Sequence, residues 1–236
     1  MKAAFRYGVT MVLIVQLALI GCASTGSGVR KIEVGEEKSF DGLVEVTNSR
    51  ASKAWVRPDF DLSGYTRVRL EGAGIEFRPV SSRSISSRSS REGQPMSQTA
   101  QARLAEIMRA AFERELSRSE RFELTDEVGP DVLTVWGGLL DVVSFVPPQR
   151  AGRDNIFLSR VGEATLVIEL RDSETNATLM RIMDRRAANR STGGIRLSNT
   201  VTNSADVRRL ANNWARLFRQ RLDEVPELSQ STDSRQ

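Results

Sequence analysis

The stretch GEATLVIELRDSETNATLMRIMDRRAA, residues 162–188, decides the fold of this 236-residue chain. Its first half alternates apolar and polar residues, which places Ala164, Leu166, Ile168 and Leu170 on one face. The letters DSETNA then supply a turn, and TLMRIMDRRA returns as a second run. Alternation with a period of two is typical of strands that bury one face and expose the other. We therefore predict a hairpin that lies on a core.

Two further strands are predicted before the hairpin. Residues 66–72 contain Val68 and Leu70 at alternating positions, and residues 132–146 are rich in β-branched and aromatic residues. Glycines inside strands often mark bulges or bends. The expected positions are Gly72 or Gly74 in the first strand, and Gly137 with Gly138 in the second.

Two segments carry apolar residues at spacings of three and four, the pattern of an amphipathic helix on a core. They are Ser97 to Arg118 and Asn203 to Leu222. The expected capping residues are Ser97 or Thr99 and Asn203 or Ser204, and Pro226 should prevent continuation of the second helix. The order β, α, β, β, β, α predicts an α+β fold, in which two amphipathic helices pack on a mainly antiparallel sheet.

The N-terminus reads as an export signal. Lys2 and Arg6 precede an apolar run of about a dozen residues, which is shorter than the roughly 20 that a spanning helix needs. The run ends Leu19-Ile20-Gly21-Cys22, which resembles the bacterial lipobox, and Cys22 is the single cysteine of the chain. The resemblance implies a signal peptide over residues 1–21 and a lipid on Cys22 that anchors the protein to a membrane. An N-terminal helix with a buried cysteine is the alternative.

Composition divides the rest of the chain. Residues 22–40 are small, polar and charged, as in a flexible tether, and residues 41–225 are long enough for a single domain. Residues 226–236 are predicted to be a disordered tail. In the lipoproteins that this N-terminus resembles, an aspartate after the cysteine retains the product in the inner membrane. Ala23 and Ser24 stand here instead, so the resemblance favours the outer membrane, with the domain facing the periplasm.

Residues 79–95 are nearly devoid of apolar groups and predict a mobile loop rich in serine and arginine. Four arginines in or beside it could bind anions such as phosphate head groups or cell-wall carboxylates: Arg78, Arg83, Arg88 and Arg91. A solvated linker is the alternative interpretation.

The charge and composition exclude several classes of function. The chain has 34 basic and 30 acidic residues, and removal of Lys2 and Arg6 with the signal leaves 32 against 30, a net charge of +2. That charge is too small to indicate nucleic-acid binding. The complete absence of histidine excludes Ser-His-Asp and Cys-His nucleophiles and imidazole-based zinc sites. Nucleotide-binding glycine motifs are also absent, so we expect neither cofactor nor metal.

Two groups of charged residues are candidate sites. Acids on or beside predicted strands could form a pair that cleaves a glycosidic bond, if two carboxyls lay within about 5–10 Å: Asp141, Glu163, Glu169 and Asp184. An ion-pair cluster could form at the hairpin from Asp172, Asp184, Arg185 and Arg186. In both cases the alternative is ordinary surface charge.

Residues 41–70 and 162–188 resemble a family of uncharacterised Gram-negative lipoproteins, known only as a domain of unknown function. The residues that fit the second stretch of the family are Glu163, Asp172, Ser173, Thr175, Asp184, Arg185 and Arg186. Asn176 replaces the turn glycine of the family, and asparagine tolerates the same left-handed backbone conformation. The resemblance implies an envelope lipoprotein of one domain and no known activity.

Three functions remain open. The first is a lipid-anchored, non-enzymatic periplasmic domain that binds an envelope protein or peptidoglycan, or has a structural role in the envelope. The second is a cell-wall or glycan hydrolase that uses paired carboxylates. The third is a carrier of a small ligand, which an apolar cavity would indicate.

Overall fold

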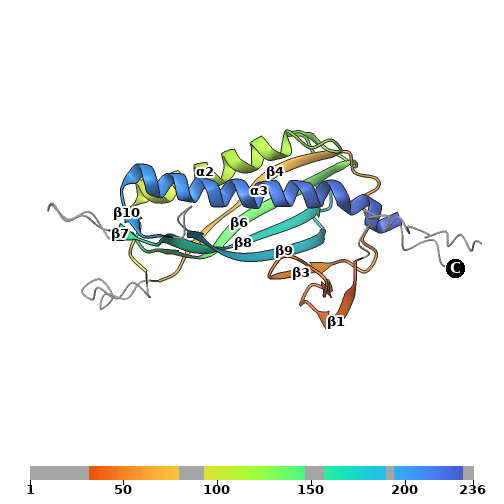
Figure 1. Ribbon diagram of the computed structural model, residues 1–236. Coiled ribbons are helices and arrows are strands. Elements are labelled where there is room, and N and C mark those ends of the chain that lie inside the picture. Colours follow the sequence, from red (N-terminus) through yellow and green to blue (C-terminus); the bar gives the residue numbers. More distant parts are fainter. Residues whose placement is uncertain (1–31, 80–92, 147–156, 190–193, 231–236) are drawn as a thin grey trace, which may run out of the picture.

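A computed structural model describes residues 32–79, 93–146, 157–189 and 194–230, which form one large sheet and two long helices (Figure 1). The sheet contains β1 (Val34–Lys38), β2 (Val44–Val46), β3 (Lys53–Val56), β4 (Arg67–Phe77), β5 (Glu123–Leu124), β6 (Val132–Ser144), β8 (Arg160–Asp172) and β9 (Thr178–Asn189). Its strand order is β1-β2-β3-β9-β8-β6-β4-β5. The helices are α2 (Gln98–Leu116) and α3 (Thr200–Gln230), and a separate pair joins β7 (Phe157–Leu158) to β10 (Arg196–Leu197).

The sheet is mainly antiparallel, which confirms the predicted α+β class. Every neighbouring pair from β1 to β6 in the strand order is antiparallel, whereas β4 pairs in parallel with both β6 and β5. Parallel neighbours need a crossover, and α2 supplies it between β4 and β6. β8 and β9 form the hairpin that the sequence predicted, and Asn176 in its turn has a left-handed backbone with φ of 57°.

Both helices lie on the same face of the sheet and begin at the same end of it (Figure 1). They pack against each other, with the rings of Phe112 and Phe218 5.9 Å apart. The buried core between helices and sheet includes Leu133, Val135, Leu166, Ile168, Leu170, Trp214 and Leu222. Within the described ranges, neither helix combines the length and the apolar composition that a membrane crossing requires.

The ends of α2 were predicted closely, and those of α3 were not. The Oγ of Ser97 accepts a hydrogen bond from the N–H of Ala100 at 3.2 Å, as expected of the cap of α2. At α3 the Oδ1 of Asn199 accepts from the N–H of Thr202 at 2.9 Å, so this cap precedes the predicted Asn203 or Ser204. The prediction that Pro226 ends α3 is wrong, because the helix continues to Gln230. Proline removes a single backbone donor, and so near a helix end it weakens the last turn without preventing it.

The N-terminal strands were not predicted. β1 lies inside the predicted tether, residues 22–40, so the folded part begins before residue 41. β1 is mostly exposed at the edge of the sheet and therefore lacks the apolar alternation that reveals a buried strand. Residues 22–31 and 231–236 lie outside the described residues, whereas residues 226–230 of the predicted tail belong to α3.

One predicted bulge is confirmed and the other is displaced. The register of β4 shifts between Gly72 and Gly74, as expected. In β6 the shift falls between Leu140 and Val143, where Asp141 has φ of 53°, and not at Gly137 and Gly138. The lack of a side chain at Gly138 has another cause, because an added Cβ would lie 2.9 Å from the Ala73 Cβ and from the Gly74 carbonyl oxygen.

The core position of Ile168 allows a test of the helix-covered face. Its side chain is 2% exposed, so Ile168→Ala should lower the free energy of unfolding by about 2–5 kcal/mol, through lost burial and the cavity left behind. Ile195→Ala is the matched control, because Ile195 is 71% exposed and its truncation should cost within about 0.5 kcal/mol. Equal effects of the two substitutions in urea unfolding would contradict the assigned face.

Candidate functional site

The sheet face turned away from the helices carries a network of arginines and carboxylates. Arg78 makes two hydrogen bonds to Asp141, from Nε to Oδ1 at 2.6 Å and from Nη2 to Oδ2 at 2.5 Å. Arg185, on β9, donates to the Asp141 Oδ2 and to the Glu163 Oε1, both at 2.6 Å. The left-handed bulge of β6 places Asp141 between Arg78, which follows β4, and Arg185 of β9. One guanidinium therefore joins the two carboxylates that lie at this bulge.

A second part of this network centres on Glu169, whose side chain is buried. Arg171 donates to its Oε2 at 2.5 and 2.8 Å, and Arg181 donates to its Oε1 at 2.6 Å. Arg181 also binds Asp41 in the turn between β1 and β2, at 2.6 and 3.1 Å. The guanidinium of Arg171 lies 4.1 Å from the ring of Trp136. These contacts tie the N-terminal strands to the hairpin.

The arginines hold these acids in the ionised form. Hydrogen bonds from Arg78 lower the pKa of Asp141 to about 2, and those from Arg181 lower the pKa of Asp41 to about 2. Burial opposes ionisation of Glu169, but the hydrogen bonds from Arg181 and Arg171 outweigh it and keep its pKa below the usual value. A general acid needs the opposite shift, toward the working pH. The network therefore fits structural ion pairing better than acid–base catalysis.

Of the predicted hairpin cluster, Asp184 and Arg186 form an ion pair, whereas Arg185 and Asp172 bind other partners. Asp184 faces α3, where its Oδ2 accepts hydrogen bonds from the Trp214 Nε1 at 2.9 Å and from the Arg186 Nε at 2.6 Å. Arg185 points to the opposite face, because successive residues of a strand alternate. Asp172 is the last residue of β8, directly before the turn to β9, and it accepts from Tyr65 Oη at 2.9 Å. The single cluster is thus three separate contacts.

The predicted anion-binding loop is only partly described. Arg78 stands one residue after β4 with its charge matched by Asp141, so it is not part of a free arginine patch. Arg83, Arg88 and Arg91 lie outside the described residues, as does Cys22. At the end of the loop, Gln94 donates its N–H to the carbonyl oxygen of Ser144 at 2.6 Å and forms a β-bridge, so that end is fixed to β6.

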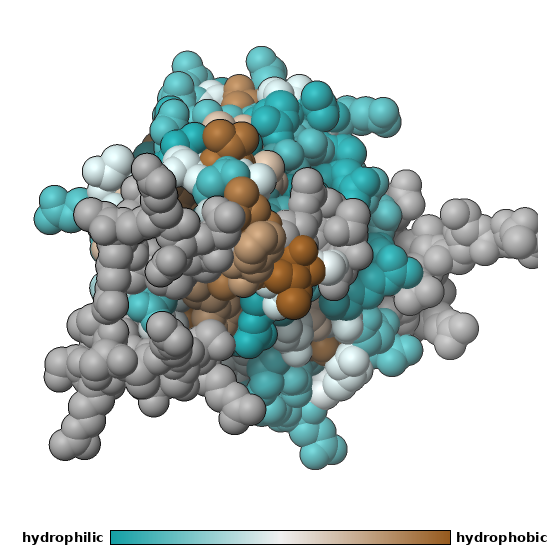
Figure 2. All heavy atoms as spheres, turned by 60° about the vertical axis from the view of Figure 1, so that its left-hand side comes forward, coloured by the Kyte–Doolittle hydropathy of each residue, from teal (hydrophilic) through white to brown (hydrophobic). Residues whose placement is uncertain are grey.

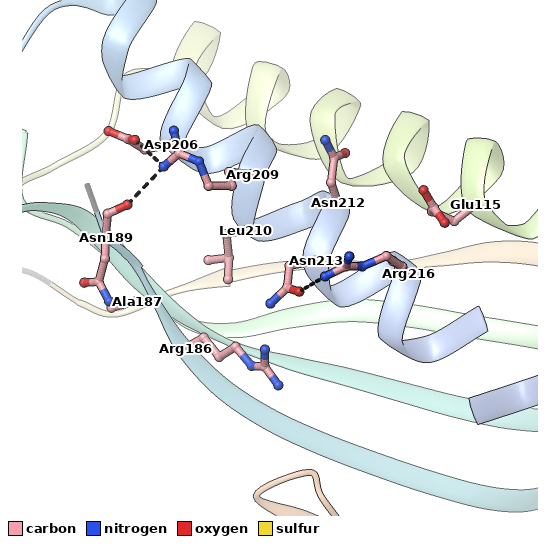
Figure 3. Close-up of a pocket in the computed structure, with 10 residues that line it drawn as sticks. All are labelled: Glu115, Arg186, Ala187, Asn189, Asp206, Arg209, Leu210, Asn212, Asn213 and Arg216. Atoms are coloured by element: carbon pink, nitrogen blue, oxygen red, sulfur yellow. Dashed lines mark hydrogen bonds and ion pairs between the residues drawn. The ribbon is translucent and has the colours of Figure 1, made fainter. Parts of the chain in front are cut away.

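A polar cleft of about 820 Å³ lies between α3 and the last part of β9 (Figure 3). Its arginines are mostly engaged: Arg209 donates to the buried Asp206 at 2.8 Å, and Arg186 is bound to Asp184. Arg216 donates to the side-chain oxygen of Asn213 at 3.0 Å. Of the described residues that were predicted as a site, this cleft contains only Arg186. Because its charges are largely paired, the cleft has little electrostatic attraction left for a ligand.

An apolar groove of about 570 Å³ lies where both helices begin, over the end of β6 and the start of β8. We call it the helix groove, and its apolar lining includes Met96, Leu104, Met108, Val142, Val161 and Leu210. Gly162 contributes to the lining without a side chain, and an added Cβ would lie 2.4 Å from the carbonyl oxygen of Val143. The sequence did not reveal the groove, because apolar residues that line a cavity and those that fill a core follow the same helical stripe.

The rim of the helix groove is positively charged. Arg103 lines it, is exposed, and within the described parts of the chain has neither a hydrogen bond nor an ion pair. The first turns of α2 and α3 also line the groove, through Ser97 and Thr200 among others, and helix N-termini carry partial positive charge. Among the described residues that line the groove, Glu163 is the carboxylate, and it is bound to Arg185.

Exposed apolar side chains surround this end of the molecule. Figure 2 shows hydrophobic atoms gathered where β7, β10 and the start of α3 lie. They include Phe157 and Leu197, which are paired across β7 and β10, together with Ile195 and Val201. Among the described residues, no group of three or more acidic, histidine or cysteine side chains is placed to hold a metal ion.

The lowered pKa of Asp141 predicts a specific acid sensitivity. A carboxyl whose pKa falls from 3.8 to about 2 on folding stabilises the protein above pH 3.8, and this contribution is lost as the pH falls toward 2. Asp141→Asn should therefore lower the urea midpoint at neutral pH and flatten its fall between about pH 4 and pH 2. Asp126→Asn, at an exposed position, is the control and should retain the wild-type slope. An unchanged slope in Asp141→Asn would refute the assigned ion pairs.

Comparisons with known proteins identify a family and distant structural likenesses. Protein XCC0632 from Xanthomonas campestris is 11% identical, with a TM-score of 0.41 over 77% of this chain and 94% of that one. The PelC dodecamer from Paraburkholderia phytofirmans is 9% identical, with a TM-score of 0.34 over 66% and 90%. A putative neuraminyllactose-binding hemagglutinin homolog from Helicobacter pylori is 8% identical, with a TM-score of 0.39 over 73% and 91%. At these scores the structures transfer no function.

No protein with a curated description matches the chain. The match that decides its classification is to the family described as Protein of unknown function (DUF3313), and it spans residues 34–218. That range includes the sheet from β1 to β9 and most of α3, and it agrees with the family resemblance seen in residues 41–70 and 162–188. The chain therefore belongs to the DUF3313 family of proteins of unknown function.

Proposed function

We propose that this protein is a lipid-anchored domain of the bacterial outer membrane, facing the periplasm, which binds another component of the envelope and does not transform it. The observation that carries the binding role is the helix groove, whose volume of about 570 Å³ lies within the range of about 300–1,000 Å³ of ligand sites. Its lining is mainly apolar, and among the described residues Arg103 is the exposed cation at the rim. Such a surface binds a ligand without needing a reactive group.

The anchor is supported by the sequence before the described residues. Cys22 follows Leu19-Ile20-Gly21 after the apolar run, and no other thiol competes for lipidation. Each buried methylene contributes about 0.8 kcal/mol to membrane binding, so several acyl chains on one cysteine suffice for stable attachment. The absence of aspartate at positions 23 and 24 favours the outer membrane.

The alternative, a glycan hydrolase with paired carboxylates, is less well supported. Of the candidate acids, Asp141 and Glu163 come together, but Arg185 binds both of them. Glu169 is enclosed by two arginines, and Asp184 is bound to Arg186 and Trp214. The arginines at this pair lower the pKa of Asp141, whereas a general acid needs a raised pKa. Binding is therefore the function that the geometry favours.

The anchor predicts a labelling result. Cells grown with an alkyne fatty acid should incorporate the label into the wild-type protein, which should fractionate with the outer membrane. Cys22→Ser should carry no label and should leave the membrane fraction, because the only thiol acceptor is lost. Equal absence of label from both proteins would overturn the anchor. Labelled protein in the inner membrane would overturn the assigned location.

The non-enzymatic role predicts that the full chain releases no soluble fragments from purified peptidoglycan. Glu163→Gln should behave in the same way, since in this account Glu163 is an ion-pair partner of Arg185. The measurement is chromatography of the released glycans, with a known hydrolase as the positive control. Release by the wild type that disappears in Glu163→Gln would establish the hydrolase instead.

A further inference from the structure

We propose that the helix groove binds the acyl chain of a free fatty acid, with the carboxylate of the fatty acid at Arg103. This inference rests on the binding role proposed above and names its ligand. The groove is apolar inside and cationic at its rim, which is the arrangement that an anionic amphiphile requires. The polar cleft beside α3 lacks the apolar lining that such a ligand needs.

The size of the groove fits one chain. A methylene occupies roughly the liquid volume of a water molecule, about 30 Å³. The groove of about 570 Å³ thus has space for roughly twenty methylenes, enough for a single long acyl chain. The flexible side chains Met96 and Met108 in the lining can adjust to chains of different length.

The lining supplies the driving force. Side chains from both helices and two strands enclose the groove, among them Leu104, Val142 and Leu210. Burial of each methylene strengthens a complex about fourfold, so the chain would contribute most of the affinity. Gly162 lets β8 approach β6 closely beside the groove, because an added Cβ would lie 2.4 Å from the carbonyl oxygen of Val143.

The rim explains why the ligand should be an acid. Arg103 is exposed and forms no ion pair within the described parts of the chain, so no described carboxylate competes with a ligand for it. Glu163 does not oppose an anion strongly, because Arg185 neutralises it at 2.6 Å. Guanidinium groups bind carboxylates through two parallel hydrogen bonds, which selects an acid over an alcohol or an ester.

The exposed apolar residues at this end give a route for the ligand. Phe157, Ile195 and Val201 are 57%, 71% and 74% exposed. Leu197 joins them to α3, since its carbonyl oxygen accepts a hydrogen bond from Thr202 Oγ1 at 3.0 Å. A fatty acid leaving a lipid surface would meet apolar side chains before entering the groove.

The test is photo-crosslinking of the purified full chain with a palmitic acid analogue that carries a diazirine and an alkyne. Crosslinks should map to residues 95–108 and 200–214, and excess palmitic acid should remove them. Excess hexadecanol should compete at least about tenfold less well, because it cannot accept the ion pair with Arg103. Absence of crosslinks from these segments, or equal competition by the alcohol, would overturn the proposal.

Matched variants test separately the binding of the acyl chain in the groove and the binding of the carboxylate at Arg103. Ala100→Trp fills the groove and should abolish crosslinking, whereas Ala102→Trp, at an exposed position outside the lining, should not. Arg103→Ala should weaken palmitic acid binding about tenfold and leave hexadecanol competition unchanged. Arg208→Ala, an exposed arginine on α3 outside the groove, is its control. Equal effects within either pair would refute the groove as the site.

The inference and the anchor fail separately. Crosslinks in the groove of a protein that carries no label at Cys22 would support the proposed ligand and contradict the proposed anchor. A lipid-labelled protein without crosslinks in residues 95–108 and 200–214 would support the proposed anchor and contradict the proposed ligand. The position of the crosslink in the digested chain distinguishes a bound fatty acid from the lipid on Cys22.

Discussion

The alternation of side chains along β8 and β9 is the constraint on which the rest of the structure depends. Leu166, Ile168 and Leu170 point to one face, and this face can be buried only if helices cover it. Glu169 and Arg185 necessarily point to the other face, where they find partners of opposite charge on neighbouring strands. The alternation of residues along these strands therefore gives the sheet one apolar face and one charged face. The groove forms on the first, and the ion pairs occupy the second.

The ion pairs give the charged face a structural explanation that needs no ligand. Asp141 occupies a left-handed bulge of β6, and the arginines of β9 and of the segment after β4 bind it there. Arg181 joins the β1–β2 turn to the hairpin through Asp41 and Glu169. Charges that are this well matched leave little free energy to be gained by binding an external ion. Arg103, which has no ion pair within the described residues, is for this reason a better indication of a ligand than the paired arginines.

The sequence predicted what periodicity and turn chemistry control. The hairpin, α2 and the bulge near Gly74 follow from alternation, a capping serine and a glycine. The strand β1 was not predicted, because an exposed edge strand lacks alternating apolar residues. The capping residue Asn199 was not predicted, because several polar residues near the start of α3 could cap that helix. The candidate sites were harder. Neighbours such as Asp184 and Arg185 looked like one cluster, although adjacent strand residues point to opposite faces. The groove was hidden because the stripe of α2 is continuous from core to cavity.

The central claim is that the helix groove is the binding surface of this family member, and hydrogen exchange of the full chain tests it most directly. Backbone exchange would be compared with and without palmitic acid, across the whole described chain. The account predicts slower exchange confined to the segments that line the groove, residues 95–108, 139–146, 161–164 and 200–214, with residues 167–185 of β8 and β9 unchanged. No change on addition of the fatty acid, or protection centred on residues 167–185, would contradict it.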